Sequence, residues 1–234
     1  MSPDIWNIWL PLIVAALVHA SFALGVSMLT LLSGRVLSQP KSERRLSILS
    51  SAYIFGAFLT ILSSVIGATY ILSNISFSSS EQFWSVLSGV ATGVGLVVLL
   101  FYYRWGKSGT RLWLPRRAAE FLYRRISATK YSFEAFILGV GSVVAELIFI
   151  AAPILVAASI IVNLCGTKQI LAILIYVVIA ILPLIILCIS NYRGKQLSAF
   201  QKWRENNKKF LQIAAGVLLI MLGIYLFVYK GIGG

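Results

Sequence analysis

Charged residues are scarce in this chain of 234 residues. They make up 12% of it, against 59% hydrophobic residues, and the mean hydropathy is +0.90. A water-soluble domain of this size needs a largely polar surface, which this composition excludes. Apolar runs of about 20 residues, long enough to cross a bilayer as helices, recur along the chain. They predict an all-α polytopic membrane protein with six transmembrane helices, at residues 8–34, 46–73, 83–103, 132–163, 168–191 and 210–229.

Histidine, cysteine and acidic residues are also rare, with one, two and seven in the whole chain. The sequence has no Cys and His cluster at metal-ligand spacing, no nucleophile motif and no glycine-rich phosphate loop, which argues against the common enzyme classes. We therefore expect a protein that is not an enzyme and that has no cofactor, while metal binding stays open. Cys165 and Cys188 fall on opposite sides of the membrane in a six-span chain, so a disulfide between them is not expected.

Basic residues are the abundant charge, with 20 Lys and Arg and a net charge of +13. Eighteen of the 20 fall in the three connections that a six-span chain places on one side of the membrane, and only Lys168 and Lys230 fall on the other. By the positive-inside rule that side is the cytoplasm, so both termini face outward. The charge thus indicates topology and contact with an anionic inner leaflet, and we expect no nucleic-acid partner. The expected location is the cytoplasmic (inner) membrane of a bacterium or archaeon.

The longest basic connection, residues 104–131, predicts a helix that lies on the inner membrane surface. Pro115 can start this helix, in which apolar residues from Ala118 to Ile126 share one face and arginines the other. Two tryptophans of the same connection fit the aromatic belt at the interface. The segment is also long enough to contact a cytosolic partner. The expected interface residues are Trp105, Trp113, Arg116, Arg117, Arg124 and Arg125.

One acidic residue, Glu146, lies near the middle of an almost unbroken apolar run from Phe133 to Val162. A charged side chain at the centre of a bilayer costs about 2.5 kcal/mol or more, so such a residue indicates a functional site and needs a partner. The only histidine, His19, lies in the same kind of run within the first span. We therefore predict that His19 and Glu146 meet near the middle of the membrane.

These two residues are 127 positions apart, and the same offset relates other residues in three successive spans. We interpret this as two halves of three spans each, residues 1–103 and 132–234, joined by the basic connection 104–131. Because three is an odd number, the second half would be inverted relative to the first. The offset pairs Phe22 with Phe149, Gly56 with Pro183, and Tyr102 with Tyr229.

The first and fourth spans are longer than a membrane requires, since a helix rises about 1.5 Å per residue against a hydrocarbon core of about 30 Å. Gly25 interrupts the first, and Gly139, Gly141 and Pro153 interrupt the fourth. Long, interrupted segments in matching positions point to broken or kinked helices that line a site between the two halves. Tilted but unbroken helices are the alternative. The second span is rich in small residues, which let helix backbones approach closely, so it should be buried among its neighbours.

Hydroxyl groups of Ser21, Ser27 and Ser142 are expected beside the predicted pair of His19 and Glu146. Burial disfavours the charged form of each partner, whereas their mutual attraction favours both charged forms. A pair balanced in this way can bind and release a proton or cation as access alternates, which is the chemistry of a proton-coupled exporter of a small solute or cation. Two alternatives stay open. The pair could be a structural link between two spans, and the protein could be a non-transporting membrane subunit that scaffolds a larger complex or a homo-oligomer.

Two stretches of the sequence carry a resemblance to known families. AGVLLIMLGIYLF follows a basic inner loop with a tryptophan, and AFILGVGSVVAELIFIAAPILVAA contains Glu146. Both are similar to spans of the lysine-exporter superfamily and of the related thiol-redox membrane proteins of cytochrome c biogenesis. The resemblance implies six spans as two inverted triplets with long first and fourth spans. The chain lacks the cysteines beside proline that the thiol-redox proteins need in these two spans, so the resemblance does not imply reductant transport, and it names no substrate.

Overall fold

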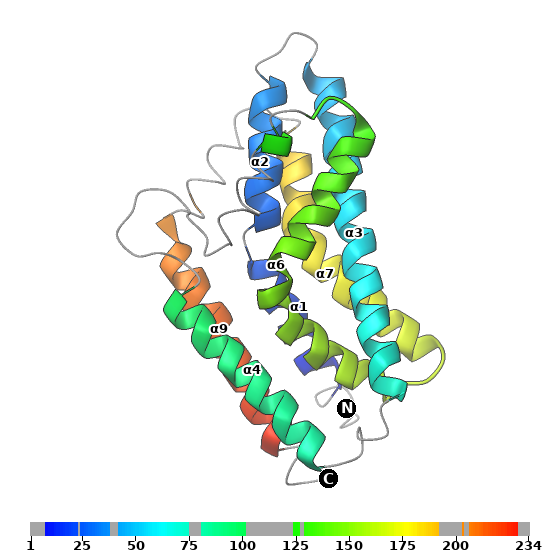
Figure 1. Cartoon of the computed structure of the whole chain (residues 1–234), viewed down its shortest axis with the longest axis vertical. Coiled ribbons are helices and arrows are strands. Elements are labelled where there is room, and N and C mark those ends of the chain that lie inside the picture. Colours follow the sequence, from blue (N-terminus) through cyan, green and yellow to red (C-terminus); the bar gives the residue numbers. More distant parts are fainter. Residues whose placement is uncertain are drawn as a thin grey trace.

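The computed structural model describes residues 8–22, 24–37, 42–74, 81–101, 124–126, 129–191, 203 and 206–228. Within these residues the regular structure is helical throughout, so the predicted all-α class is confirmed there. Long helices run up and down a single bundle, and the first residue of α1 and the last of α9 lie toward the same end of it (Figure 1). The helices are α1 (Leu10–Ser21), α2 (Leu24–Leu37), α3 (Ser42–Asn74), α4 (Glu81–Phe101), α6 (Ser132–Ile161), α7 (Thr167–Asn191) and α9 (Lys208–Leu226).

Five of these helices are long and apolar enough to cross a membrane, and a sixth span is present if the bent pair of α1 and α2 is counted as one. Each of these segments overlaps one of the predicted ranges. A helix of about 20 apolar residues spans the hydrocarbon core and pairs its own backbone N–H and C=O groups, so the apolar runs mark the spans. Many large apolar side chains point outward rather than into the bundle, among them Ile71, Leu100 and Ile189. An outer surface of this kind is suited to lipid, so the helices are compatible with a polytopic integral membrane protein.

The first span is broken between α1 and α2, and the axis of α2 is bent by 43° from the axis of α1. Pro11 stands in the first turn of α1, where its missing N–H costs no hydrogen bond. The helix ends at Ser21, because Phe22 has an extended backbone and donates its N–H to the carbonyl of His19 at 3.2 Å. The predicted interruption of this span is therefore present, between Ser21, where α1 ends, and Leu24, where α2 begins.

The fourth span is the single helix α6, which begins with a capping box. The Glu134 carboxylate accepts hydrogen bonds from the backbone N–H groups of Lys130 at 2.6 Å and Tyr131 at 3.1 Å, satisfying donors that the first turn leaves free. The helix then continues without a break to Ile161. Gly139, Gly141 and Pro153 therefore do not break this span, and a kink at one of them stays a prediction. A helix in a packed bundle tolerates these residues because neighbouring helices hold it in place.

Glycine in the middle of the bundle serves close helix packing. A Cβ atom on Gly139 of α6 would overlap the backbone carbonyl of Tyr53 in α3, and one on Gly56 of α3 would overlap the carbonyl of Phe136 in α6. The two backbones therefore touch directly, as small residues allow in membrane helices. This close approach fixes α3 against the helix that carries Glu146. The prediction that the second span is buried among its neighbours is wrong, because only 28% of its most apolar stretch is buried.

A second close pair, α4 and α9, lies along one side of the bundle (Figure 1). Polar side chains link the two helices at both ends of their contact. Ser88 Oγ donates to the carbonyl of Gly223 at 2.7 Å, and Gln212 Nε2 lies 2.8 Å from the carbonyls of both Val98 and Leu99. In lipid such hydrogen bonds hold helices together where the hydrophobic effect cannot.

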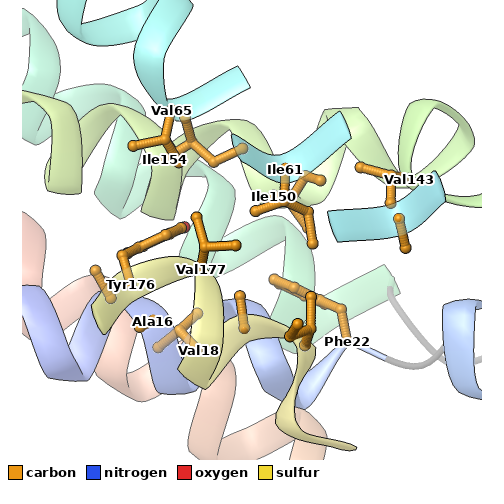
Figure 2. Close-up of a cluster of buried hydrophobic side chains, with 14 of the residues drawn as sticks. Ala16, Val18, Phe22, Ile61, Val65, Val143, Ile150, Ile154, Tyr176 and Val177 are labelled. Atoms are coloured by element: carbon orange, nitrogen blue, oxygen red, sulfur yellow. The ribbon is translucent and has the colours of Figure 1, made fainter. Parts of the chain in front are cut away.

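Part of the buried core lies between α1, α3, α6 and α7, and the core continues to α2, α4 and α9. Figure 2 shows Ile61 of α3 beside Ile150 of α6, and Val65 beside Ile154, with Tyr176 and Val177 of α7 across from them. Ala16 and Val18 of α1 close the cluster from the other side. Helices from both predicted halves contribute, so the chain has one shared core, and the candidate site lies at its edge.

Candidate functional site

A cavity opens beside the break between α1 and α2. The polar side chains that line it are His19 of α1 and Ser142 and Glu146 of α6. Gly25, near the start of α2, also lines it. The remaining walls are apolar and come from α3, α6, α7 and the two halves of the first span. They are formed by Ala20, Phe22, Val26, Ile61, Val143, Ile150, Ala180, Pro183 and Leu184.

Glu146 reaches this cavity from the middle of α6. Its side chain is buried, with 8% of its surface exposed. Ser142 stands one turn before it and Ile150 one turn after, and all three line the cavity. Residues four apart share one face of a helix, so this face of α6 presents a carboxylate flanked by a hydroxyl and an apolar side chain.

His19 lines the same cavity from the end of α1 and is also buried. Its Nδ1 atom lies 2.9 Å from the hydroxyl of Tyr176 in α7, and the two rings meet edge to face with centroids 5.7 Å apart. The structure thus brings His19 and Glu146 to one cavity, as expected. The hydrogen bond of the His19 ring goes to Tyr176, and a direct contact between His19 and Glu146 stays a prediction.

Tyr53 joins three helices at the edge of the cavity. Its side chain is fully buried, and its hydroxyl lies 3.0 Å from the carbonyl of Gly25 and 2.7 Å from Ser142 Oγ. Ser142 Oγ in turn lies 2.8 Å from the carbonyl of Gly139. Each hydroxyl has one proton, so the chain of bonds runs either from Tyr53 through Ser142 to Gly139, or from Ser142 through Tyr53 to Gly25.

Neither tyrosine was among the residues expected at the site. A usable signal existed, because a tyrosine within an apolar span must find a hydrogen-bond partner when it is buried. Tyr53 and Tyr176 both lie within predicted spans. The sequence does not say which partner each one meets, since that depends on how the helices are arranged.

The three predicted serines differ in their positions. Ser142 lines the cavity, whereas Ser21 donates to the carbonyl of Val18 in its own helix at 2.6 Å. Ser27 is half-buried in α2 and is not among the residues that line the cavity in the described part of the chain. Membrane helices commonly satisfy a hydroxyl through a carbonyl three or four residues earlier, so a serine near a site need not face it.

Phe22 and Phe149, which the 127-residue offset pairs, lie against each other at the break. Their ring centroids are 6.1 Å apart and the ring planes are tilted by 34°. Phe22 also lines the cavity, so this pair borders it on the side of α1 and α6. Of the four residues predicted to interrupt helices, Gly25 lines the cavity, and Pro153 is buried elsewhere within α6.

A metal centre of the usual kind has no support in the described ranges, where no three His, Cys, Asp or Glu side chains cluster. Both cysteines are free, with Cys165 exposed and Cys188 half-buried. Among the expected interface residues, Arg124 and Arg125 are exposed and the following Ile126 is buried, in line with an amphipathic helix. The other four, Trp105, Trp113, Arg116 and Arg117, lie outside the described residues.

Comparison of the chain with protein-family models, curated proteins and solved structures gives no match. The resemblance to the lysine-exporter superfamily and to the thiol-redox proteins of cytochrome c biogenesis therefore stays a prediction. The function has to be argued from the geometry of the cavity and from the chemistry of the few polar groups that line it.

Proposed function

We propose that the protein is a membrane transporter, an exporter of a small solute or cation, in which protons exchange at the cavity beside the broken first span. The observation that carries the proposal is that the one carboxylate in the middle of a span and the only histidine of the chain line the same cavity. Ionisable groups inside a membrane protein are costly and mark pathways for ions, protons or substrates.

The cavity argues against a purely structural role for Glu146. A carboxylate that only links two helices would be expected to be sealed among its partners, because open space beside a buried charge adds to its cost. Here the carboxylate shares its cavity with Gly25, Ser142 and an imidazole. Space of this kind next to a carboxylate is what an exchangeable proton or a bound cation needs.

The break in the first span supports the same reading. A helix that ends inside the membrane leaves its last carbonyl groups without the N–H partners of a continuous helix. It also carries a partial negative charge at that end. The end of α1, at Ser21, lies next to residues that line the cavity. Transporters of several folds use the ends of such half-helices to hold coupling ions.

An inverted repeat of residues 1–103 and 132–234 is part of the proposal, and two observations support it. Phe22 and Phe149 are equivalent under the 127-residue offset and touch each other, as residues beside a two-fold axis should. The contacts between helices also agree with the repeat, which makes α1 equivalent to α6, α3 to α7 and α4 to α9. Contact of α1 with α7 corresponds to contact of α6 with α3, and contact of α1 with α9 to contact of α6 with α4.

The direction of transport and the orientation of the chain rest on sequence arguments. The distribution of lysine and arginine places both termini outside, and the exporter direction follows the resemblance to the lysine-exporter superfamily. The second candidate, a subunit that scaffolds a membrane complex, would need no solute to move. It predicts zero flux from the isolated protein under every condition.

The test is proton movement in liposomes that contain the purified protein and a trapped pH-sensitive dye. A panel of monovalent cations, divalent cations and amino acids is added outside, and the internal pH is followed. We expect at least one solute to drive a pH change with wild type, and Glu146→Gln to reduce its rate tenfold or more. Glu134→Gln is the matched control, because it removes a carboxylate from the same helix while Gln can still cap the first turn.

Two results would contradict the proposal. If no member of the panel moves protons in wild-type liposomes, the scaffold alternative gains. If Glu146→Gln transports as fast as wild type and Glu134→Gln, the carboxylate in the cavity has no part in the mechanism.

A further inference from the structure

The hydrogen bond between Tyr176 and His19 determines where the protons of both groups lie. Tyr176 is fully buried in α7, and in the described part of the chain the His19 ring is the one hydrogen-bond partner of its hydroxyl. A phenol has a proton to donate, and a buried donor without an acceptor is strongly disfavoured. The hydroxyl of Tyr176 therefore donates, and Nδ1 of His19 accepts.

A ring nitrogen that accepts a hydrogen bond carries no proton. In a neutral imidazole the proton then sits on the other nitrogen, Nε2. Because Nδ1 faces Tyr176, Nε2 is the nitrogen that remains for the cavity that His19 lines. The cavity thus meets an N–H donor rather than an acceptor from this side.

A second proton on His19 would have to bind Nδ1. The Tyr176 hydroxyl would then no longer be able to donate its own proton to that nitrogen. The tyrosine hydroxyl would then be left buried with no acceptor, so its hydrogen bond opposes the charged form of the ring. Among the described residues, the other titratable side chain that lines the cavity is Glu146 from α6. Tyr53 from α3 lies beside the cavity, with its hydroxyl against Gly25 and Ser142. Glu146 is therefore the group left to change its charge.

We infer that Tyr176 is a positioning residue that holds His19 as the neutral Nε2–H tautomer, so that Glu146 alone exchanges one proton for one monovalent cation. The inference rests on the proposed function. It assigns the exchange of protons to the carboxyl group of Glu146 alone rather than to His19 and Glu146 together. In the exchange, the protonated carboxyl of Glu146 loses H⁺ and the carboxylate then binds the cation. One positive charge leaves for each one that arrives, so the cycle moves no net charge.

The tautomer is tested by nitrogen NMR of protein labelled with ¹⁵N-histidine in micelles. The chain has one histidine, so each ring nitrogen gives one signal without assignment. We expect wild type to show a proton-free Nδ1 and a protonated Nε2 from roughly pH 6 to 8, where an ordinary histidine titrates. Tyr176→Phe should lose this single-tautomer spectrum, and Tyr70→Phe, which alters an exposed tyrosine, should keep it.

A wild-type ring with its proton on Nδ1, or with two protons at neutral pH, would overturn the inference. This spectrum is independent of transport, so a failure here leaves the proposed function standing. Because the wild-type spectrum alone decides the tautomer, the test holds even if Tyr176→Phe folds poorly.

The stoichiometry is tested in liposomes with a trapped pH-sensitive dye, using sodium as an inorganic cation and choline as an organic one. Valinomycin with equal K⁺ on both sides holds the membrane potential at zero. For whichever cation is exchanged, we expect the initial rate to be the same with and without valinomycin. A rate that rises severalfold when the potential is held at zero would mean that net charge moves and would overturn exchange by one carboxyl group. If neither cation moves protons but a divalent cation or an amino acid does, exchange with a monovalent cation is overturned and the proposed function stands. If no solute moves protons, the proposed function itself fails.

Discussion

The hydroxyl of Tyr53 lies 2.7 Å from Ser142 Oγ and 3.0 Å from the carbonyl of Gly25. It thereby links α3 to α6, which carries Glu146, and to the start of α2, directly after the break in the first span. Any movement of α2 relative to α6 has to lengthen or replace one of these two hydrogen bonds. Tyr53 is thus placed to couple the broken span to the helix that carries the carboxylate.

Replacing Tyr53 with Phe removes this link and leaves Ser142 and Gly25 without the hydroxyl. We expect the free energy of unfolding to fall by about 0.6–1.7 kcal/mol, the range measured for hydrogen bonds between membrane helices. Thermal unfolding in detergent measures the change. Tyr70→Phe on the same helix alters an exposed ring and should leave the midpoint unchanged. Equal midpoints for the two variants would contradict the coupling.

The glycine contacts between α3 and α6 predict a sharp difference between two Gly→Ala variants. Gly139→Ala places a methyl group against the carbonyl of Tyr53 and forces the helices apart, which typically costs about 1–3 kcal/mol. Gly67→Ala on α3 meets no atom within 4 Å, so it should be neutral or stabilise the helix by about 0.5–1 kcal/mol. Chemical unfolding of both variants measures the difference. Comparable loss of stability in both would show that close packing is not what Gly139 provides.

Gln212 is expected to hold α9 against α4. Its side-chain amide is buried and lies 2.8 Å from the carbonyls of Val98 and Leu99. Gln212→Leu should lower the midpoint of thermal unfolding, since it removes about 0.6–2 kcal/mol of interhelical hydrogen bonding. Gln169→Leu, at the half-buried start of α7, serves as the control. An unchanged midpoint for Gln212→Leu would show that this amide does not hold α9 against α4.

Cys165 offers a test of the orientation of the chain, because it is exposed in the turn between α6 and α7. With both termini outside, this turn faces outward. A maleimide that cannot cross membranes should label the Cys188→Ala variant in intact cells, and Cys165→Ala should remain unlabelled until the cells are opened. Labelling of Cys165 only after cell lysis would invert the topology and contradict the positive-inside interpretation.

The spans could be predicted from the sequence because their cause is local. A bilayer requires about 20 apolar residues in a row for each helix, and the predicted ranges follow such runs. The meeting of His19 and Glu146 at one cavity could also be anticipated, because an ionisable group in an apolar span needs a polar neighbour and the chain offers few.

The finer features could not be predicted because they depend on which helices face each other. Glycine permits both a break and a close approach, so Gly139 was assigned to a break when it serves the contact with α3. The actual break, between the end of α1 at Ser21 and the start of α2 at Leu24, follows no proline. The partners of Tyr53 and Tyr176 come from helices far away in the sequence, and no spacing rule connects them.

The central claim is that the carboxyl group of Glu146 exchanges a proton for a cation inside the cavity. The most direct test is to titrate the cation that moves protons in liposomes into detergent-solubilised protein in weakly buffered solution and record the protons released. We expect wild type and Glu134→Gln to release about one proton per bound cation at a pH at which the carboxyl group is mostly protonated, and Glu146→Gln to release none. Proton release from Glu146→Gln equal to that from wild type would contradict the account.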